Sequence, residues 1–141
     1  METNFLLQYT RKTMQAYDKA SKSICSEIGV PKTAFDILMF LANNHSYNTA
    51  KDIVEYRGLK ANHVSINVDK LVNEGYLERS EDKHDRRKVI LKCTKKAAPI
   101  IERGRAMQKA FLEQMLAGIP PESLAVMREI MMKISDNIDE M

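Results

Sequence analysis

The amino-acid sequence predicts a mainly α-helical fold that carries one small β-hairpin. Two observations lead to this prediction. Apolar side chains recur at spacings of three and four along most of the 141 residues, which is typical of helices with one buried face. Residues 76–93 differ, because two short runs rich in Tyr, Leu, Val and Ile flank a turn that is crowded with charge.

Length and composition indicate a globular protein. With 141 residues, 44% of them hydrophobic, the chain can bury a core without disulfides or metal ions. No stretch approaches the roughly 20 apolar residues that a membrane span needs, and the N-terminus lacks the pattern of a secretory signal. We therefore expect one domain with extensions, located in the cytoplasm and without a membrane partner.

The sequence contains no pattern that indicates catalysis or metal binding. Its five glycines are scattered singly, and no Ser-His-Asp order or metal-ligand spacing occurs, so we expect neither an enzyme nor a cofactor or metal site. Cys25 and Cys93 lie far apart and lack Cys-x-x-Cys spacing, which favours reduced thiols. A redox-responsive role for Cys25 or Cys93 is the alternative.

Positive charge is concentrated in one segment. Residues 1–56 have no net charge, residues 57–96 carry a net charge of +5, and residues 97–141 carry −2. A surface that contacts phosphates requires such a local excess of positive charge. The segment 57–96 is therefore the part of the chain that is expected to meet an anionic partner.

Two helices are expected before this segment. An apolar stripe from about residue 4 to residue 28 predicts one long helix, which Gly29 and Pro31 end. Residues 32–43 form a second helix that is apolar nearly all round, as is typical of a helix buried on several sides. The first helix is long for so small a domain, which indicates packing outside the local core.

A helix-turn-helix pattern follows. Thr49 is a candidate N-cap of a short helix, with Asp52 in the position of its acidic partner. Gly58 lies in the turn, and a second helix at about 61–74 ends at Gly75.

The N-terminal part of the second helix is expected to read DNA. Its exposed polar and aliphatic side chains would meet base edges, and two lysines would meet phosphates. The expected base contacts are Asn62, His63, Ser65 and Ile66, and the expected phosphate contacts are Lys60 and Lys70. The alternative is that these residues are ordinary solvated positions of a surface helix.

The hairpin at about 76–94 strengthens the DNA-binding interpretation. Its turn is so basic that it would make a poor hairpin tip unless an anionic partner met it. Asp85 can hold an arginine by charge-assisted hydrogen bonds, and an arginine held in this way can enter a narrow minor groove. The expected contacts in the hairpin are Arg79, Asp85, Arg86, Arg87 and Lys88. Residues 31–95 are thus predicted to form a winged helix-turn-helix module.

Apolar stripes also mark two helices in residues 96–141, separated by a break at 116–121. Together with the helix in residues 1–30, these stripes exceed what one small module can cover. A second copy of the chain would bury them, and a homodimer would match the two-fold symmetry of an inverted-repeat operator. Residues 1–30 and 96–141 are therefore the expected dimerisation helices.

The segment LVNEGYLERSEDKHDRRKVILKCTKKA resembles the signature of the MarR family of bacterial transcriptional regulators. The family pattern combines a glycine that closes the recognition helix, a strand ending in Glu-Arg, Asp-x-Arg in the wing, and a threonine before a long helix. This chain supplies these features at Gly75, Glu78-Arg79, Asp85-x-Arg87 and Thr94. Many members have an arginine in the recognition helix where this chain has Ile66, so the resemblance does not carry over that contact.

The resemblance implies a sequence-specific regulator of transcription, with a repressor favoured over an activator. It implies a homodimer that binds a double-stranded, pseudo-palindromic DNA operator and that a small aromatic effector can release. A winged-helix module that binds proteins instead of DNA is a further alternative. The operator sequence and the effector cannot be read from these residues.

Overall fold

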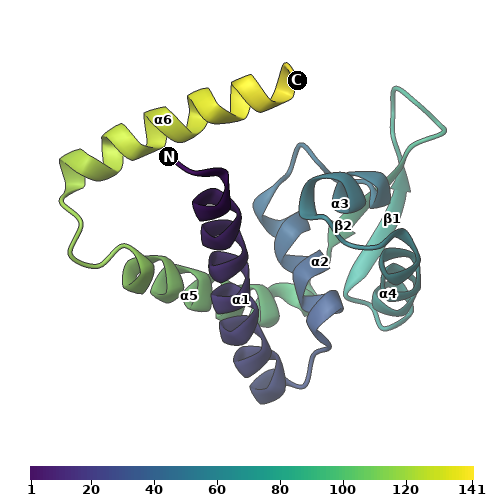
Figure 1. Cartoon of the computed structure of the whole chain (residues 1–141). Helices are drawn as coiled ribbons and strands as arrows, with labels where there is room; N and C mark the ends of the chain where they lie inside the picture. Colours follow the sequence, from purple (N-terminus) through teal and green to yellow (C-terminus); the bar gives the residue numbers. More distant parts are fainter. The chain divides into compact units, whose positions relative to one another are not determined.

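The computed structural model describes all 141 residues and shows six α-helices and one two-stranded antiparallel hairpin (Figure 1). The elements in order are α1 (Thr3–Ile28), α2 (Lys32–Asn43), α3 (Ala50–Arg57), α4 (Ala61–Asn73), β1 (Leu77–Glu81), β2 (Val89–Cys93), the 3₁₀ turn η1 (Lys95–Ala97), α5 (Ala98–Met115) and α6 (Pro121–Asp139). The predicted fold class is confirmed, and every predicted helix and strand is present within a few residues of its expected bounds.

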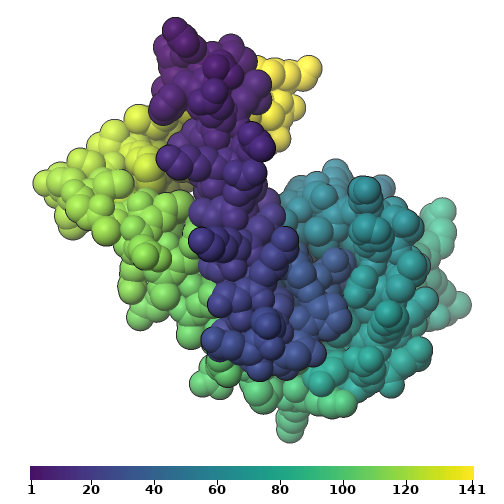
Figure 2. All heavy atoms as spheres, turned by 60° about the horizontal axis from the view of Figure 1, so that its bottom comes forward, coloured from purple at the N-terminus to yellow at the C-terminus, as the bar shows by residue number.

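The chain forms two compact units, Met1–Lys109 and Ala110–Met141, and the boundary between them lies inside α5. The first unit contains α1, the helix-turn-helix, the hairpin and most of α5. Figure 2 shows the first turns of α1 standing clear of the winged module, in agreement with the exposure of the side chains before residue 13. The half of α1 that contributes to the core is the second half, through Ser21 and Cys25.

Helix α2 is the centre of the first unit. Residues 34–42 are all buried, and Phe35, Ile37 and Leu38 have no exposed surface. Helix α5 approaches α2 closely at Gly104, where an added Cβ atom would lie 2.9 Å from Cε2 of Phe35. The prediction that this helix is buried on several sides is confirmed, and the buried set includes one charged residue, Asp36.

The hairpin and α4 share a core with α2. Val64, Val68 and Leu71 recur along the buried face of α4 and pack in one cluster with Leu77 of β1 and Leu91 of β2. Burying aliphatic side chains of this size stabilises a fold by about 1.5–3 kcal/mol each relative to exposure. The wing is therefore anchored at its base by hydrophobic packing.

The two strands pair in register from Leu77 opposite Cys93 to Glu81 opposite Val89. The loop before α3 adds one further backbone hydrogen bond, in which the N–H of Leu91 donates to the carbonyl oxygen of Asn48 over 2.7 Å. Figure 1 shows the loop between β1 and β2 extending beyond the strands, away from the helices of this unit. The charged turn predicted from the sequence is thus the free tip of the wing.

The second unit consists of the end of α5, a turn and α6. The turn contains Gly118 in the left-handed region (φ +80°), and Pro121 occupies the first turn of α6, as predicted from the break at 116–121. No residue of α6 is buried. No helix of the protein has the length and apolar character that crossing a membrane requires.

Candidate nucleic-acid interface

The recognition-helix candidate α4 has two distinct faces. One face is buried in the core of the module, and the other is open to solvent. All six α4-region residues predicted to contact DNA are exposed: Lys60, Asn62, His63, Ser65, Ile66 and Lys70. Ile66, the one large aliphatic residue among them, is 54% exposed.

Local interactions within α3 and the turn that follows it define the start and the end of this helix. Thr49 and Asp52 form a capping box at the start of α3: the Thr49 hydroxyl accepts from the N–H of Asp52, and the Asp52 carboxylate accepts from the N–H of Thr49. Gly58 ends α3 in the left-handed region (φ +73°), which glycine adopts without steric cost. Both predictions about this turn are confirmed, so the position of α4 relative to α3 follows from local sequence.

Hydrogen bonds close the base of the wing onto the end of α4. Gly75 (φ +83°) turns the chain out of the helix, and the N–H of Tyr76 donates to the carbonyl oxygen of Leu71 over 2.8 Å. The Thr94 hydroxyl donates to the carbonyl oxygen of Gly75 over 2.6 Å. Lys96 adds a hydrogen bond from its Nζ to the carbonyl oxygen of Glu74 over 2.6 Å.

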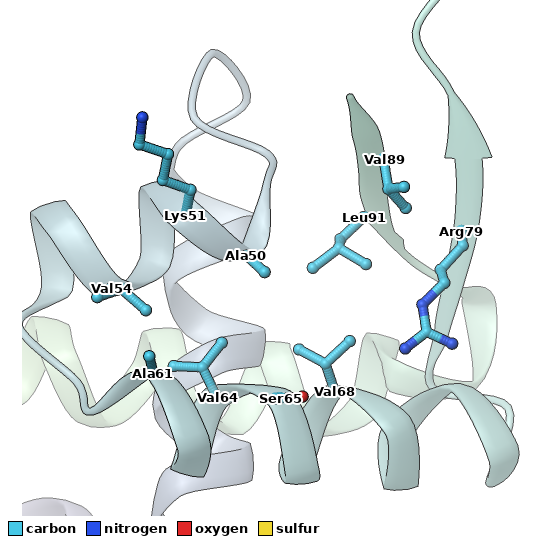
Figure 3. A pocket seen from close by; sticks show the side chains of 10 residues that line it. All are labelled: Ala50, Lys51, Val54, Ala61, Val64, Ser65, Val68, Arg79, Val89 and Leu91. Carbon is cyan, nitrogen blue, oxygen red and sulfur yellow. The ribbon is translucent and has the colours of Figure 1, made fainter. Parts of the chain in front are cut away.

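Arg79 has a partner that sequence reasoning missed. Its guanidinium forms an ion pair and hydrogen bond with the carboxylate of Asp69, on the exposed face of α4. Figure 3 shows the Arg79 side chain reaching from its strand toward this helix. Arg79 was predicted to contact DNA, and the structure shows that it also ties the wing to α4. The signal in the sequence was an acidic residue on an otherwise basic and polar face.

A pocket of about 480 Å³ lies between the hairpin, α3 and α4 (Figure 3). Its walls are mainly aliphatic, with Lys51 and Arg79 as its charged members and Ser65 as its hydroxyl; the full lining is Ala50, Lys51, Val54, Ala61, Val64, Ser65, Val68, Arg79, Val89 and Leu91. The structure places no group of three or more His, Cys, Asp or Glu side chains together as metal ligands.

Acidic side chains shape the wing tip through the backbone. Asp85 accepts a hydrogen bond from the backbone N–H of Arg87 over 3.0 Å, whereas its distance to Nε of Arg87 is 3.7 Å. Asp82 likewise accepts from the backbone N–H of His84 over 2.9 Å. Arg86, Arg87 and Lys88 are exposed, and the side chain of Arg87 retains 96% of its accessible surface. The carboxylates therefore order the loop while the basic side chains stay available.

The chain matches a protein-family model, described as the MarR family, over residues 28–88. This range contains α2, the helix-turn-helix and most of the wing. A curated relative, the uncharacterized HTH-type transcriptional regulator YfiV of Bacillus subtilis (strain 168), is 31% identical over 80 residues. Over its winged helix-turn-helix module the chain is similar to proteins of the MarR family. The aligned region spans 54% of this chain and 50% of YfiV, so the chain spans about half the length of this relative.

Solved MarR structures extend the likeness to nearly the whole chain at the level of the fold. A MarR family transcriptional regulator from Listeria monocytogenes, solved with 26mer DNA, has a TM-score of 0.80 and 16% identity, covering 95% of this chain and 89% of its own. CouR from Rhodococcus jostii RHA1, bound to p-coumaroyl-CoA, has a TM-score of 0.68 and 20% identity. The likeness covers 92% of this chain and 88% of the CouR chain. Members of the MarR family are transcription regulators and not enzymes.

The two MarR signature positions Gly75 and Thr94 are in direct contact in this chain. Their spacing in sequence is explained by the hairpin between them, which returns β2 to the end of α4. The Asp85-x-Arg87 part of the signature is explained by the backbone hydrogen bond that orders the tip. The residues of the signature are thus structural supports of the wing as well as candidate DNA contacts.

Both cysteines of the chain are free thiols; Cys25 is buried and Cys93 is partly buried. Cys25 lies on the buried face of α1, and burial, with a further contribution from the charge of Asp36, raises the pKa of its thiol. Burial also raises the pKa of Cys93, which lies 3.7 Å from the carbonyl oxygen of Leu38. Since the thiolate is the form that oxidants attack, this environment disfavours the redox alternative.

Proposed function

We propose that the protein is a sequence-specific DNA-binding regulator of transcription, a repressor, that binds a double-stranded inverted-repeat operator as a homodimer. One observation carries the proposal: the exposed polar face of α4 adjoins a wing whose basic tip is free, and the net charge of +5 belongs to this segment. A winged-helix module that only bound proteins would have no need of this charge.

In the proposed complex, α4 of each subunit enters a major groove. Asn62, Ser65 and Ile66 meet base edges, where an amide can pair with adenine and an aliphatic side chain can contact a thymine methyl group. His63 lies on the same exposed surface, and Lys60 and Lys70 contact phosphates. The wing brings Arg86, Arg87 and Lys88 to the flanking minor groove, with Asp85 ordering the tip and Arg79 holding the wing against α4.

Exposed apolar surface supports the homodimer. Helix α6 exposes Val126, Ile130, Met131, Met132, Ile134 and Ile138, and the first half of α1 exposes Phe5, Leu6, Leu7, Tyr9 and Met14. Soluble monomers rarely expose contiguous apolar patches of more than a few hundred Å². We propose that a second copy of the chain covers these exposed apolar surfaces. A symmetric dimer would place two recognition helices about 34 Å apart, which fits half-sites one turn of DNA apart. Residues 1–30 and 96–141 are therefore the proposed dimerisation helices, flanking the DNA-binding module at residues 31–95.

We also propose that a small aromatic effector regulates DNA binding. The support is the structural likeness to CouR, which was solved with p-coumaroyl-CoA. An effector with higher affinity for a dimer whose recognition helices are wrongly spaced for the operator would shift the population away from DNA. The expected result of such binding is release of the operator.

Selection of bound sequences from random double-stranded DNA tests the proposed activity. The expected product is an inverted repeat with half-sites about 10 base pairs apart, centre to centre. Recovery of no enriched sequence would refute sequence-specific binding, and enrichment of one unrepeated half-site would refute binding as a symmetric dimer.

Light scattering tests the dimer without DNA. The expected mass is about twice that of the 16.2 kDa chain. A variant with Ile130 and Ile134 both changed to Asp should shift the mass toward that of one chain, because two carboxylates would be buried in the proposed interface. A wild-type mass of one chain at all concentrations would contradict the dimer.

A further inference from the structure

Helix α2 carries a carboxylate in the middle of its buried run. Asp36 is 4% exposed and lies between fully buried Phe35 and Ile37. Two cations contact it: Nζ of Lys32 lies 2.6 Å from Oδ2, and Nη2 of Arg57 lies 3.3 Å from Oδ1. The sequence pattern describes this helix as apolar nearly all round, so the buried charge requires its own explanation.

The same two cations contact α1. Nζ of Lys32 is also 3.2 Å from Oδ1 of Asp18, and the guanidinium carbon of Arg57 lies 6.0 Å from the centre of the Tyr17 ring. Tyr17 and Asp18 are neighbours in sequence, so both contacts fall on one stretch of α1. Asp36 therefore lies at the centre of a polar junction that joins α1, α2 and the end of α3.

Such a junction is poorly suited to provide stability alone. Removing a charge from water costs several kcal/mol, and well-packed apolar residues often replace buried ion pairs with no loss of stability. The pairing here is also incomplete, since Oδ1 of Asp36 accepts no hydrogen bond from within the protein. Burial opposes the charge of Lys32, but its hydrogen bonds to Asp36 and Asp18 outweigh burial and raise the pKa of Lys32, so the ammonium stays charged.

The junction instead defines the orientation of α3 relative to α1 and α2. Arg57 is the last residue of α3 and directly precedes Gly58, the turn that leads into α4. Its guanidinium faces the Asp36 carboxylate of α2 and also lies over the Tyr17 ring of α1, so a shift of α3 relative to either helix would change one of these contacts. An apolar contact in the same place would tolerate sliding of one helix along the other.

We propose that Asp36 and Arg57, with Lys32, are positioning residues that set the angle between α1 and the recognition helix α4. The proposal extends the proposed function: if α1 belongs to the dimer interface, this angle sets the separation of the two recognition helices and hence the preferred spacing of the operator half-sites. None of the three residues is among the proposed DNA contacts.

The first test measures the angle directly and needs no DNA. Spin labels at Lys22→Cys on α1 and Asn73→Cys at the end of α4, in a Cys25→Ser, Cys93→Ser background, report one distance within a chain when labelled protein is diluted with unlabelled protein. Both labelled positions are exposed. Arg57→Gln and Asp36→Asn should each shift or broaden the distance distribution. Unchanged distributions in both folded variants would overturn the proposal.

The second test measures operator spacing. Wild-type protein and each variant are titrated against the selected operator and against operators with one base pair added to or removed from the spacer. The variants should lose the preference for the native spacer by about fivefold or more, while binding to altered spacers stays the same or improves. An equal loss on all spacers would indicate a purely structural role and would overturn the proposed effect on half-site spacing.

Three variants make the tests decisive. Glu27→Gln with Arg103→Gln removes an exposed ion pair between α1 and α5 (2.7 Å) and should leave both measurements unchanged. Arg57→Lys keeps the charge without the planar fork and should give an intermediate spacing preference. If Asp36→Asn does not fold, Arg57→Gln, at a side chain that is 21% exposed, still decides the outcome. A wild-type protein that binds no operator would refute the proposed function but leave the distance test valid.

Discussion

The hydroxyl of Thr94 donates a hydrogen bond to the carbonyl oxygen of Gly75 over 2.6 Å, although the two residues lie 19 positions apart. This bond closes the hairpin onto the end of α4 and is accompanied by a backbone hydrogen bond from the N–H of Thr94 to the carbonyl oxygen of Tyr76 over 3.0 Å. The direction of the wing therefore depends on the end of α4.

Replacing Thr94 by valine should destabilise the module by about 0.5–1.5 kcal/mol, the net contribution of a typical hydrogen bond, because the exposed carbonyl of Gly75 loses this donor while the shape is kept. Thr94→Ser keeps the hydroxyl and should stay closer to the wild type. Chemical denaturation followed by circular dichroism measures both. Equal stability of the valine variant and the wild type would show that water replaces the hydroxyl without cost.

Replacing Arg86 and Arg87 together by alanine should lower operator affinity and leave the proposed dimer intact, because both side chains are exposed at the wing tip. If both contact phosphates, the slope of log affinity against log salt should also become shallower by about two. Gel shifts at several salt concentrations measure both quantities. Lys19→Ala with Lys22→Ala, on exposed positions of α1, is the charge-matched control. Unchanged binding would show that Arg86 and Arg87 of the wing do not contact the operator.

Replacing Ile66 by alanine should remove the contact with a thymine methyl group. In the wild type, exchanging the contacted thymine for uracil should cost about 0.8 kcal/mol, the typical value for one buried methylene-sized group. The alanine variant should not distinguish thymine from uracil. Titration of the selected operator with thymines exchanged singly measures the effect. A wild-type protein that is indifferent to every such exchange would show that Ile66 does not read methyl groups.

Replacing Gly104 by alanine should destabilise the first unit by about 1–3 kcal/mol through overpacking. The added Cβ would lie 2.9 Å from the Phe35 ring, and Met39 would have to move as well. Thermal unfolding measures the loss. A double variant that also carries Met39→Ala should relieve part of the crowding caused by the added Cβ. A single variant as stable as the wild type would show that Phe35 and Met39 move aside without cost.

Peroxide should not change DNA affinity, because the raised pKa values of Cys25 and Cys93 reduce the thiolate fraction at neutral pH. For the same reason, alkylation of both thiols should begin at a higher pH than that of a free cysteine. Gel shifts after peroxide treatment and mass spectrometry across a pH series test this. A loss of affinity that a thiol reagent reversed would establish the redox alternative.

The sequence by itself determined the features that depend on neighbouring residues. Apolar periodicity placed the helices now seen as α1, α4, α5 and α6, and a nearly continuous apolar run placed α2. The Thr49 and Asp52 pair placed the start of α3, and Gly58 and Gly75 placed two turns because these positions adopt positive φ. The charge of the wing and the exposure of the predicted α4 contacts also followed from sequence, since both depend on which residues stand at which helical or strand positions.

Only the tertiary structure decided which side chains meet across the fold. The pairing of Arg79 with Asp69 and the burial of Asp36 between Lys32 and Arg57 were not predicted. In the sequence, Asp36 is one acidic residue in an apolar helix, and nothing in its local pattern shows whether it points to solvent. Its burial follows from the packing of α1 and the end of α3 against α2, and long-range packing of this kind has no periodic signature.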